Sequence, residues 1–138
     1  MTLDPVGRRL YVSHAMRVEV LDADSGKVVG SIADTPGVHG IAIAGQHGFT
    51  TNGRENTLTV FTPATLAVIK KLDVGKGPDG IFNHAGTKRI FTCNHGSDDI
   101  AVVHRRGHGE GGRVRSETAQ DCEADANWSG QSADRPGL

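Results

Sequence analysis

Two residues that could bind a ligand hold matching places in the chain. His39 stands directly before the pair Gly40-Ile41, and Asp79 stands directly before the repeated pair Gly80-Ile81. An imidazole and a carboxylate can together donate and accept hydrogen bonds, so they suit a polar ligand. We therefore take them as candidate ligand-binding residues. The alternative is that each is a polar loop residue that satisfies nearby backbone groups.

Three further polar residues are weaker candidates for the same role. His14, Asn52 and Asn94 each follow a short β-type run at a corresponding point of the chain. The alternative for all three is a turn-forming role. No nucleophile with a recognisable base accompanies them, since Ser13 adjoins His14 but neighbouring residues of a strand point to opposite faces. The sequence therefore predicts no catalytic residue.

The seven histidines of the chain raise the question of a metal or haem site. Only His104 and His108 are closely spaced, and they lie in a polar C-terminal segment without the ligand pattern of a zinc site. The sequence contains no Cys-x-x-Cys-His haem attachment motif. We expect neither a metal nor a cofactor.

Composition excludes several classes of partner. The 15 Lys and Arg residues balance 16 Asp and Glu residues, whereas nucleic acids and anionic membranes select clustered positive charge. No apolar run approaches the roughly 20 residues that span a bilayer, and the first residues lack the features of a secretory signal. We expect no nucleic-acid partner, no membrane insertion and, for the chain as written, a cytoplasmic location.

The two cysteines differ in context. Cys93 lies in a predicted strand, where we expect it to be a small buried apolar residue. Cys122 lies in a polar segment, and nothing in the sequence supports a disulfide between the two.

The candidate residues belong to a repeat with a period of about 40 residues. The most complete unit has four short β-type runs separated by turns, which is typical of a propeller blade, a small four-stranded antiparallel sheet. The four predicted strands are 40–44, 49–52, 57–61 and 66–74. The sequence thus predicts an all-β fold, an incomplete β-propeller made of antiparallel four-stranded blades.

Residues 1–103 divide into three units, at about 3–35, 38–75 and 78–103. We expect the first unit to lack its innermost strand, because 3–9 looks like the turn that would follow it. We expect the third unit to lack its outermost strand. A blade packs between two neighbours, so both ends of such an arc would expose large apolar faces. These faces predict binding to a protein partner or self-association.

Several of these segments resemble the YVTN-type β-propeller repeat family. The matching pieces are 9–13 (RLYVS), 18–29 (VEVLDADSGKVV) and Pro36-Gly37 ahead of Gly40-Ile41, and the resemblance covers 3–103. It implies a closed ring of about seven blades, often in exported or periplasmic proteins. It also implies a binding or scaffold role without catalysis by the chain itself. The alternative that it implies is a propeller enzyme or cofactor module, similar to lactonases or to haem d1 domains.

Residues 104–138 depart from the repeat. They lack strand periodicity and are poor in aliphatic residues, as in a disordered polar tail. A second interpretation is that they are an aberrant reading of blade sequence in a shifted frame. Moving the codons on by one base from His104 permits Ile-Asp-Ala-Ala-Thr-Gly-Lys-Val-Val-Gly-Ser-Val, a near copy of the run from Leu21 to Ile32.

The nucleotide sequence decides between these two interpretations of the tail. We expect the frame shifted by one base after Val103 to encode a continued blade pattern without stop codons. Sequencing the gene and its flanks is the measurement. Stop codons in that frame, or no alternation of apolar residues, would leave the disordered tail as the explanation.

Overall fold

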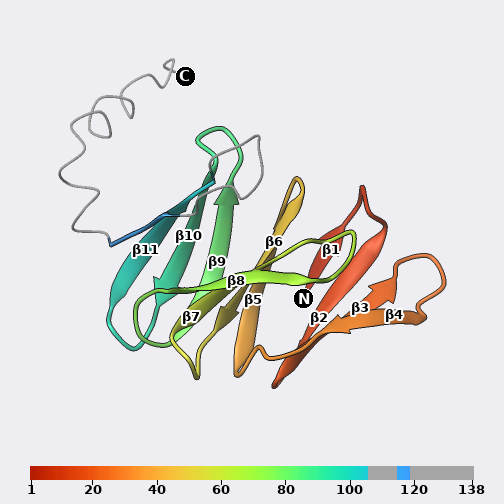
Figure 1. The fold of residues 1–138 in the computed structure, drawn as a ribbon, viewed down its shortest axis with the longest axis horizontal. Helices are drawn as coiled ribbons and strands as arrows, with labels where there is room; N and C mark the ends of the chain where they lie inside the picture. Colours follow the sequence, from red (N-terminus) through yellow and green to blue (C-terminus); the bar gives the residue numbers. More distant parts are fainter. Residues whose placement is uncertain (106–114, 119–138) are drawn as a thin grey trace, which may run out of the picture.

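The computed structural model describes residues 1–105 and 115–118, which contain β-strands and turns but no helix. The strands form three four-stranded antiparallel sheets that stand side by side as blades (Figure 1), each with its strands in sequence order. The first blade contains β1 (Thr2–Asp4), β2 (Arg9–His14), β3 (Arg17–Asp22) and β4 (Val28–Ile32); the second contains β5 (Val38–Ala44), β6 (His47–Asn52), β7 (Thr57–Phe61) and β8 (Val68–Asp73); the third contains β9 (Pro78–His84), β10 (Arg89–Asn94), β11 (Asp99–His104) and β12 (Arg115–Thr118). The predicted all-β fold of four-stranded antiparallel blades is confirmed.

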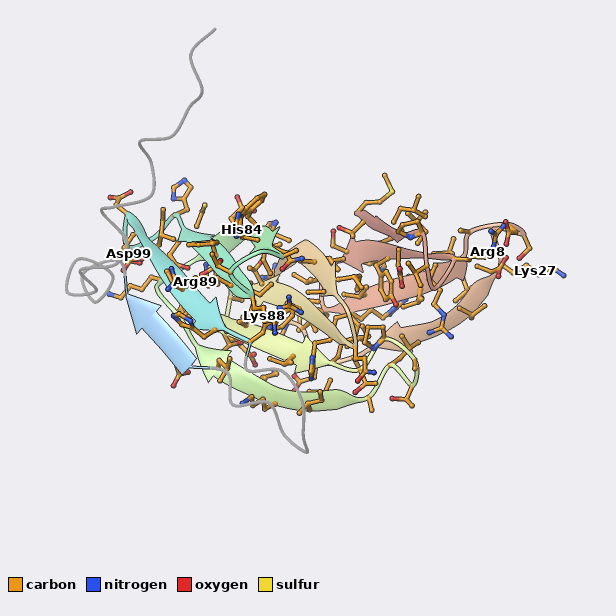
Figure 2. The ribbon with its side chains drawn as sticks, turned by 90° about the horizontal axis from the view of Figure 1, so that it is seen from above. Arg8, Lys27, His84, Lys88, Arg89 and Asp99 are labelled. Carbon is orange, nitrogen blue, oxygen red and sulfur yellow. The ribbon has the colours of Figure 1, made fainter. Side chains whose placement is uncertain are left out.

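Seen from above, the three blades lie in a row (Figure 2). Arg8 and Lys27 mark the end formed by the first blade, and Asp99 marks the end formed by the third. Of the three described blades, only the second therefore has a neighbouring blade on both faces.

The prediction that the first blade lacks its innermost strand is wrong. β1 pairs with β2, with Thr2 opposite Tyr11. The Thr2 hydroxyl also donates a hydrogen bond to the carbonyl oxygen of Ile41 in β5, at 2.6 Å, so the second blade holds this strand in place. Three residues are too few to show an alternation of apolar and polar side chains, which is why the sequence pattern missed β1.

The third blade likewise has an outermost strand, although we predicted that it has none. β12 pairs antiparallel with β11, and Ser116 lies opposite Val103. The four residues of β12 are Arg, Ser, Glu and Thr, so its pairing depends on backbone hydrogen bonds and leaves no apolar pattern in the sequence. The rest of the predicted tail, 106–114 and 119–138, lies outside the described residues.

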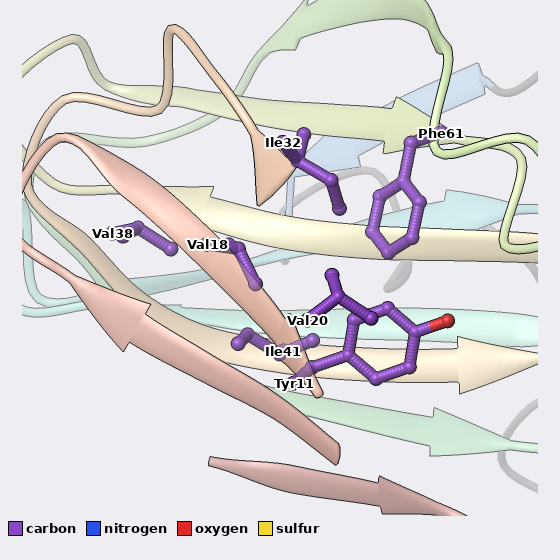
Figure 3. Close-up of a cluster of buried hydrophobic side chains, with 7 residues drawn as sticks. All are labelled: Tyr11, Val18, Val20, Ile32, Val38, Ile41 and Phe61. Atoms are coloured by element: carbon purple, nitrogen blue, oxygen red, sulfur yellow. The ribbon is translucent and has the colours of Figure 1, made fainter. Parts of the chain in front are cut away.

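The hydrophobic core lies between blades. One cluster joins the first blade to the second (Figure 3); its members are Tyr11, Val18, Val20, Ile32, Val38, Ile41 and Phe61. A second cluster joins the second blade to the third; its buried members are Ala44, Phe49, Leu58, Val60, Ile90 and Val103. The rings of Tyr11 and Phe61 have centroids 5.8 Å apart. Each sheet thus depends on its neighbour to bury its apolar side chains.

Cys93 is exposed, contrary to our prediction that it is buried. It lies opposite Ile100 of β11, and Ile100 and Phe82 in the same blade are 44% and 61% exposed. These residues belong to the face of the third blade that no described blade covers. A strand position that is buried in an inner blade is therefore exposed in an end blade.

Truncation of one buried and one exposed phenylalanine should show that packing between blades, and not exposed apolar surface, stabilises the fold. Phe61 is fully buried between blades, so Phe61→Ala should lower the free energy of unfolding by about 3–5 kcal/mol, the usual cost of emptying such a site. The matched control is Phe82→Ala at the 61% exposed position, which should change the free energy of unfolding by less than about 1 kcal/mol. Denaturant unfolding of the dilute chain is the measurement, and equal losses would contradict the arrangement of the core.

Candidate functional site

The chain crosses from the first blade to the second through a residue that bonds to both. Gly37 donates its N–H to the carbonyl oxygen of Ala15 in the first blade, at 2.7 Å. Its own carbonyl oxygen accepts the N–H of Gly53 in the second blade, at 3.0 Å. Gly37 has a φ of 67°, a left-handed conformation that glycine adopts without steric cost.

The crossover from the second blade to the third repeats this arrangement. Gly77, with a φ of 58°, donates its N–H to the side-chain oxygen of Asn56 in the second blade, at 2.9 Å. Its carbonyl oxygen accepts the N–H of His95 in the third blade, at 3.0 Å. Because each crossover glycine bonds to the blades on both sides of it, the residues that follow the two crossovers enter their blades at equivalent positions.

His39 and Asp79 come together from adjacent blades. Each is the second residue of an innermost strand, because β5 and β9 begin at Val38 and Pro78. The strand predicted at 40–44 thus begins slightly earlier, at Val38. His39 Nδ1 lies 3.7 Å from Asp79 Oδ1, and the two side chains are 59% and 61% exposed. That distance is too long for a direct hydrogen bond, and an exposed pair of this kind contributes little to stability. Both side chains therefore keep hydrogen-bonding capacity for a third polar group.

Thr51 and Gly40 position this pair, although sequence reasoning assigned neither to a site. The buried Thr51 hydroxyl accepts the N–H of Gly40 at 2.8 Å and donates to the carbonyl oxygen of Asp79 at 2.8 Å. A Cβ on Gly40 would lie 2.6 Å from the same oxygen and 2.8 Å from Ile81 Cγ2. The two innermost strands thus approach too closely for any other residue. The repeated Gly-Ile pair was a signal for Gly40, but nothing in the sequence distinguishes Thr51 from its neighbouring threonines.

The weaker candidate Asn52 ends β6, and its side chain is fully buried. Its amide group donates to Thr57 Oγ1 at 2.9 Å and to Thr59 Oγ1 at 2.7 Å. Its side-chain oxygen accepts a hydrogen bond from Thr50 Oγ1 at 3.2 Å. All of these partners lie in the second blade, so the side chain of Asn52 stabilises its own sheet.

The other two weaker candidates occupy equivalent positions, since His14 ends β2 and Asn94 ends β10. Asn94 is buried, accepts from Thr92 Oγ1 at 3.1 Å and donates to Asp99 Oδ1 at 2.8 Å. Hydrogen bonds from Ser97 and from Asn94 lower the pKa of Asp99, so this carboxylate stays charged at neutral pH. The side chain of His14 is exposed at the end of β2. The structure thus brings together His39 and Asp79, whereas the side chains of Asn52 and Asn94 bond to residues of their own blades.

Two findings concern the described residues as a whole. Within 1–105 and 115–118, no group of three or more His, Cys, Asp or Glu side chains is placed to hold a metal ion. In the same residues there is no helix that is long and apolar enough to cross a membrane.

No family model matches the sequence, and no curated protein matches it. Solved structures match its fold. A hydrazine synthase from Kuenenia stuttgartiensis is 24% identical and aligns with 74% of this chain and 31% of its own, with a TM-score of 0.70. A candidate 6-phosphogluconolactonase from Bacteroides fragilis is 13% identical over 83% of this chain and 36% of its own, with a TM-score of 0.70. Another from Bacteroides uniformis is 19% identical over 83% of this chain and 37% of its own, also with a TM-score of 0.70.

The described chain has the fold of a β-propeller segment. It spans about a third of the length of each of these solved structures. Their low sequence identity limits the likeness to the fold, so the residues that act in those proteins say nothing about His39 and Asp79.

Alanine in place of two equivalent glycines should test how the site is positioned. Gly40→Ala should lower the free energy of unfolding by about 1–3 kcal/mol, because the added methyl group would push β9 away from β5. It should also shift the side-chain NMR signals of His39 and Asp79. The matched control is Gly80→Ala, whose Cβ would meet only the side chain of Cys93, at 3.5 and 3.6 Å. Equal effects of the two substitutions would contradict the role of Gly40.

Proposed function

We propose that the chain is part of a YVTN-type β-propeller and acts as a binding or scaffold module. His39 and Asp79 would contact a polar ligand at the entry to the innermost strands, where adjacent blades present side chains to one molecule. The hydrogen-bonding capacity that both side chains keep, at a separation of 3.7 Å, supports this role. The exposed faces of the end blades would bind further blades.

The observation that carries the proposal is that the two ends of the arc are the two halves of one blade–blade contact. On the third blade, Phe82 lies opposite Phe91, with ring centroids 6.4 Å apart. The equivalent pair of the second blade is Ala42 and Phe49, and there Phe49 is fully buried in the cluster shared with the third blade. The open face of the third blade is therefore the face that a following blade covers.

The open face of the first blade is the opposite half of the same contact. A row of apolar residues crosses its four strands at directly paired positions; these are Leu3, Leu10, Leu21 and Val28. Leu3 and Val28 are 57% and 63% exposed. In the second blade the position of Leu21 is taken by Phe61, which packs against the first blade. These four residues, called the leucine row below, therefore form a face that a preceding blade would cover. Phe82 and Phe91 are called the phenylalanine pair.

These two faces suit each other better than either suits itself. A second copy of the chain would place its leucine row on the phenylalanine pair of the first copy, as consecutive blades do within the chain. Such a contact is head-to-tail, so it can be repeated until a ring closes. Burial of two apolar faces provides the free energy for association.

Charged substitutions on the two faces should reveal this association. We expect the unaltered chain to form closed oligomers in native mass spectrometry. Phe82→Asp alone and Leu10→Asp alone should each give monomers, because each removes one half of every contact. A mixture of the two variants should give dimers, since one intact phenylalanine face and one intact leucine row remain to meet.

A substitution away from both faces is the control for this experiment. Ser25→Asp adds the same charge in the exposed turn before β4 and should leave the oligomers intact. A monomer for the unaltered chain at high concentration would exclude self-association. Monomers from the mixture would exclude the head-to-tail arrangement.

The second candidate is a propeller enzyme or cofactor module, of lactonase-like or haem d1-like type. It is kept because two of the structures with this fold are candidate 6-phosphogluconolactonases. Turnover of a lactone that His39→Ala abolishes, or a haem absorption band after reconstitution, would favour this candidate over a binding module.

A further inference from the structure

A cleft of about 930 Å³ opens between the first two blades, at the other end of β5 from His39. It is lined by β1 and the turn after it, by Arg9 and Tyr11 of β2, and by the turns 45–47 and 62–64 of the second blade. The volume is within the range of small-molecule sites, which is roughly 300–1,000 Å³. Because both walls belong to this chain, the cleft does not depend on the faces at the ends of the arc.

The hydroxyl group of Tyr11 is the unexplained feature of this cleft. Tyr11 is fully buried, and its hydroxyl group forms no hydrogen bond of ordinary geometry with the described residues, although the Arg9 guanidinium lies close to it. In Figure 3 the oxygen points away from the apolar side chains that surround the ring. The equivalent positions in the other two blades hold Phe49 and Phe91. Packing between blades accounts for an aromatic ring at this position, but it leaves the hydroxyl group of Tyr11 buried without an acceptor, which is unfavourable.

The hydroxyl keeps its proton and is therefore a hydrogen-bond donor. Burial is the largest effect and raises the pKa of Tyr11; the adjacent Arg9 guanidinium opposes the rise through a hydrogen-bond interaction and its charge, and the charge of Asp4 adds to it. The pKa stays above its ordinary value, so the group is protonated at neutral pH. It lacks only an acceptor atom, which a bound molecule could supply.

Two opposite charges stand beside this hydroxyl. Asp4 and Arg9 are paired across β1 and β2, and Asp4 is only 9% exposed although the equivalent residue of the second blade is Ala44. Asp4 Oδ1 accepts the N–H of Val6 at 3.1 Å. Arg9 Nη1 donates to the carbonyl oxygen of Pro63 at 2.5 Å. Each side chain thus has a fixed contact with the backbone, and both line the cleft with further hydrogen-bonding capacity.

The chemistry of these groups narrows the ligand. A carboxylate next to a guanidinium leaves the cleft without net charge from that pair, so a charged ligand gains little there. A donor from Tyr11, donors from Arg9 and an acceptor from Asp4 suit hydroxyl groups, which both donate and accept. Val6, Ile43 and Pro63 provide apolar surface for the body of the molecule. We propose that this cleft binds a neutral sugar of one or two rings, which accepts hydrogen bonds from Tyr11 and Arg9 and donates to Asp4.

Binding of maltose and of methyl glucoside to the labelled full chain tests the proposal. We expect both sugars to shift the NMR signals of the backbone amides in 4–7 and 45–47. Tyr11→Phe should weaken the binding about tenfold, the effect of one lost hydrogen bond. The variant should fold with an unchanged or higher melting temperature, because it carries the residue that the other blades have at this position. Its loss of affinity would therefore not reflect unfolding.

Matched probes and variants complete the test. Arg9→Gln should also weaken sugar binding, whereas Arg54→Gln, an exposed arginine of the β6–β7 turn, should not. The proposal is overturned if neither sugar shifts these amides, if gluconate or glucosamine binds more tightly than the neutral sugars, or if Tyr11→Phe binds them as tightly as the unaltered chain. Because the probes address a cleft far from His39 and Asp79, failure here would leave the proposed function untouched.

Discussion

The structure depends on one constraint: each sheet can bury its apolar side chains only against another sheet. A four-stranded sheet of this size has two apolar faces and no interior of its own. Tyr11 and Val20 of the first blade are therefore buried by Phe61 of the second, and Phe49 of the second is buried with Ile90 of the third. Stability accumulates through such contacts between neighbours, as in other repeat proteins. The same constraint leaves the leucine row and the phenylalanine pair exposed at the ends.

Polar groups near the innermost strands determine how the blades are aligned once their faces are in contact. The hydroxyl of Thr51 bonds to backbone groups of both the second and the third blade. The crossover glycines Gly37 and Gly77 each bond to the two blades that they connect. Hydrogen bonds are directional, whereas apolar packing tolerates sliding. The closeness of His39 to Asp79 is thus a consequence of alignment rather than of their own weak attraction.

Departures from the repeat are more informative about binding than the repeat itself. The asparagines that end β6 and β10 are buried in hydrogen bonds within their own blades, whereas the first blade has the exposed His14 at this position. Phenylalanine takes the position of Tyr11 in both other blades, and the position of Asp4 is taken by Ala44 in the second blade and by His84 in the third. The polar atoms of Tyr11 and Asp4 are buried at a cost that the fold does not require.

The sequence alone determined the three units, most of their strands and the equivalence of His39 with Asp79, because period-two alternation and turn residues are local features. It could not determine the three-residue β1 or the polar β12, since both exist through backbone pairing with strands elsewhere. It also misplaced Cys93, whose exposure depends on which face of the third blade has a neighbour. The role of Thr51 and the cleft beside Tyr11 exist only between blades. The tertiary structure decided these features, because contacts between sheets join residues that are distant in the chain and leave no periodic pattern in it.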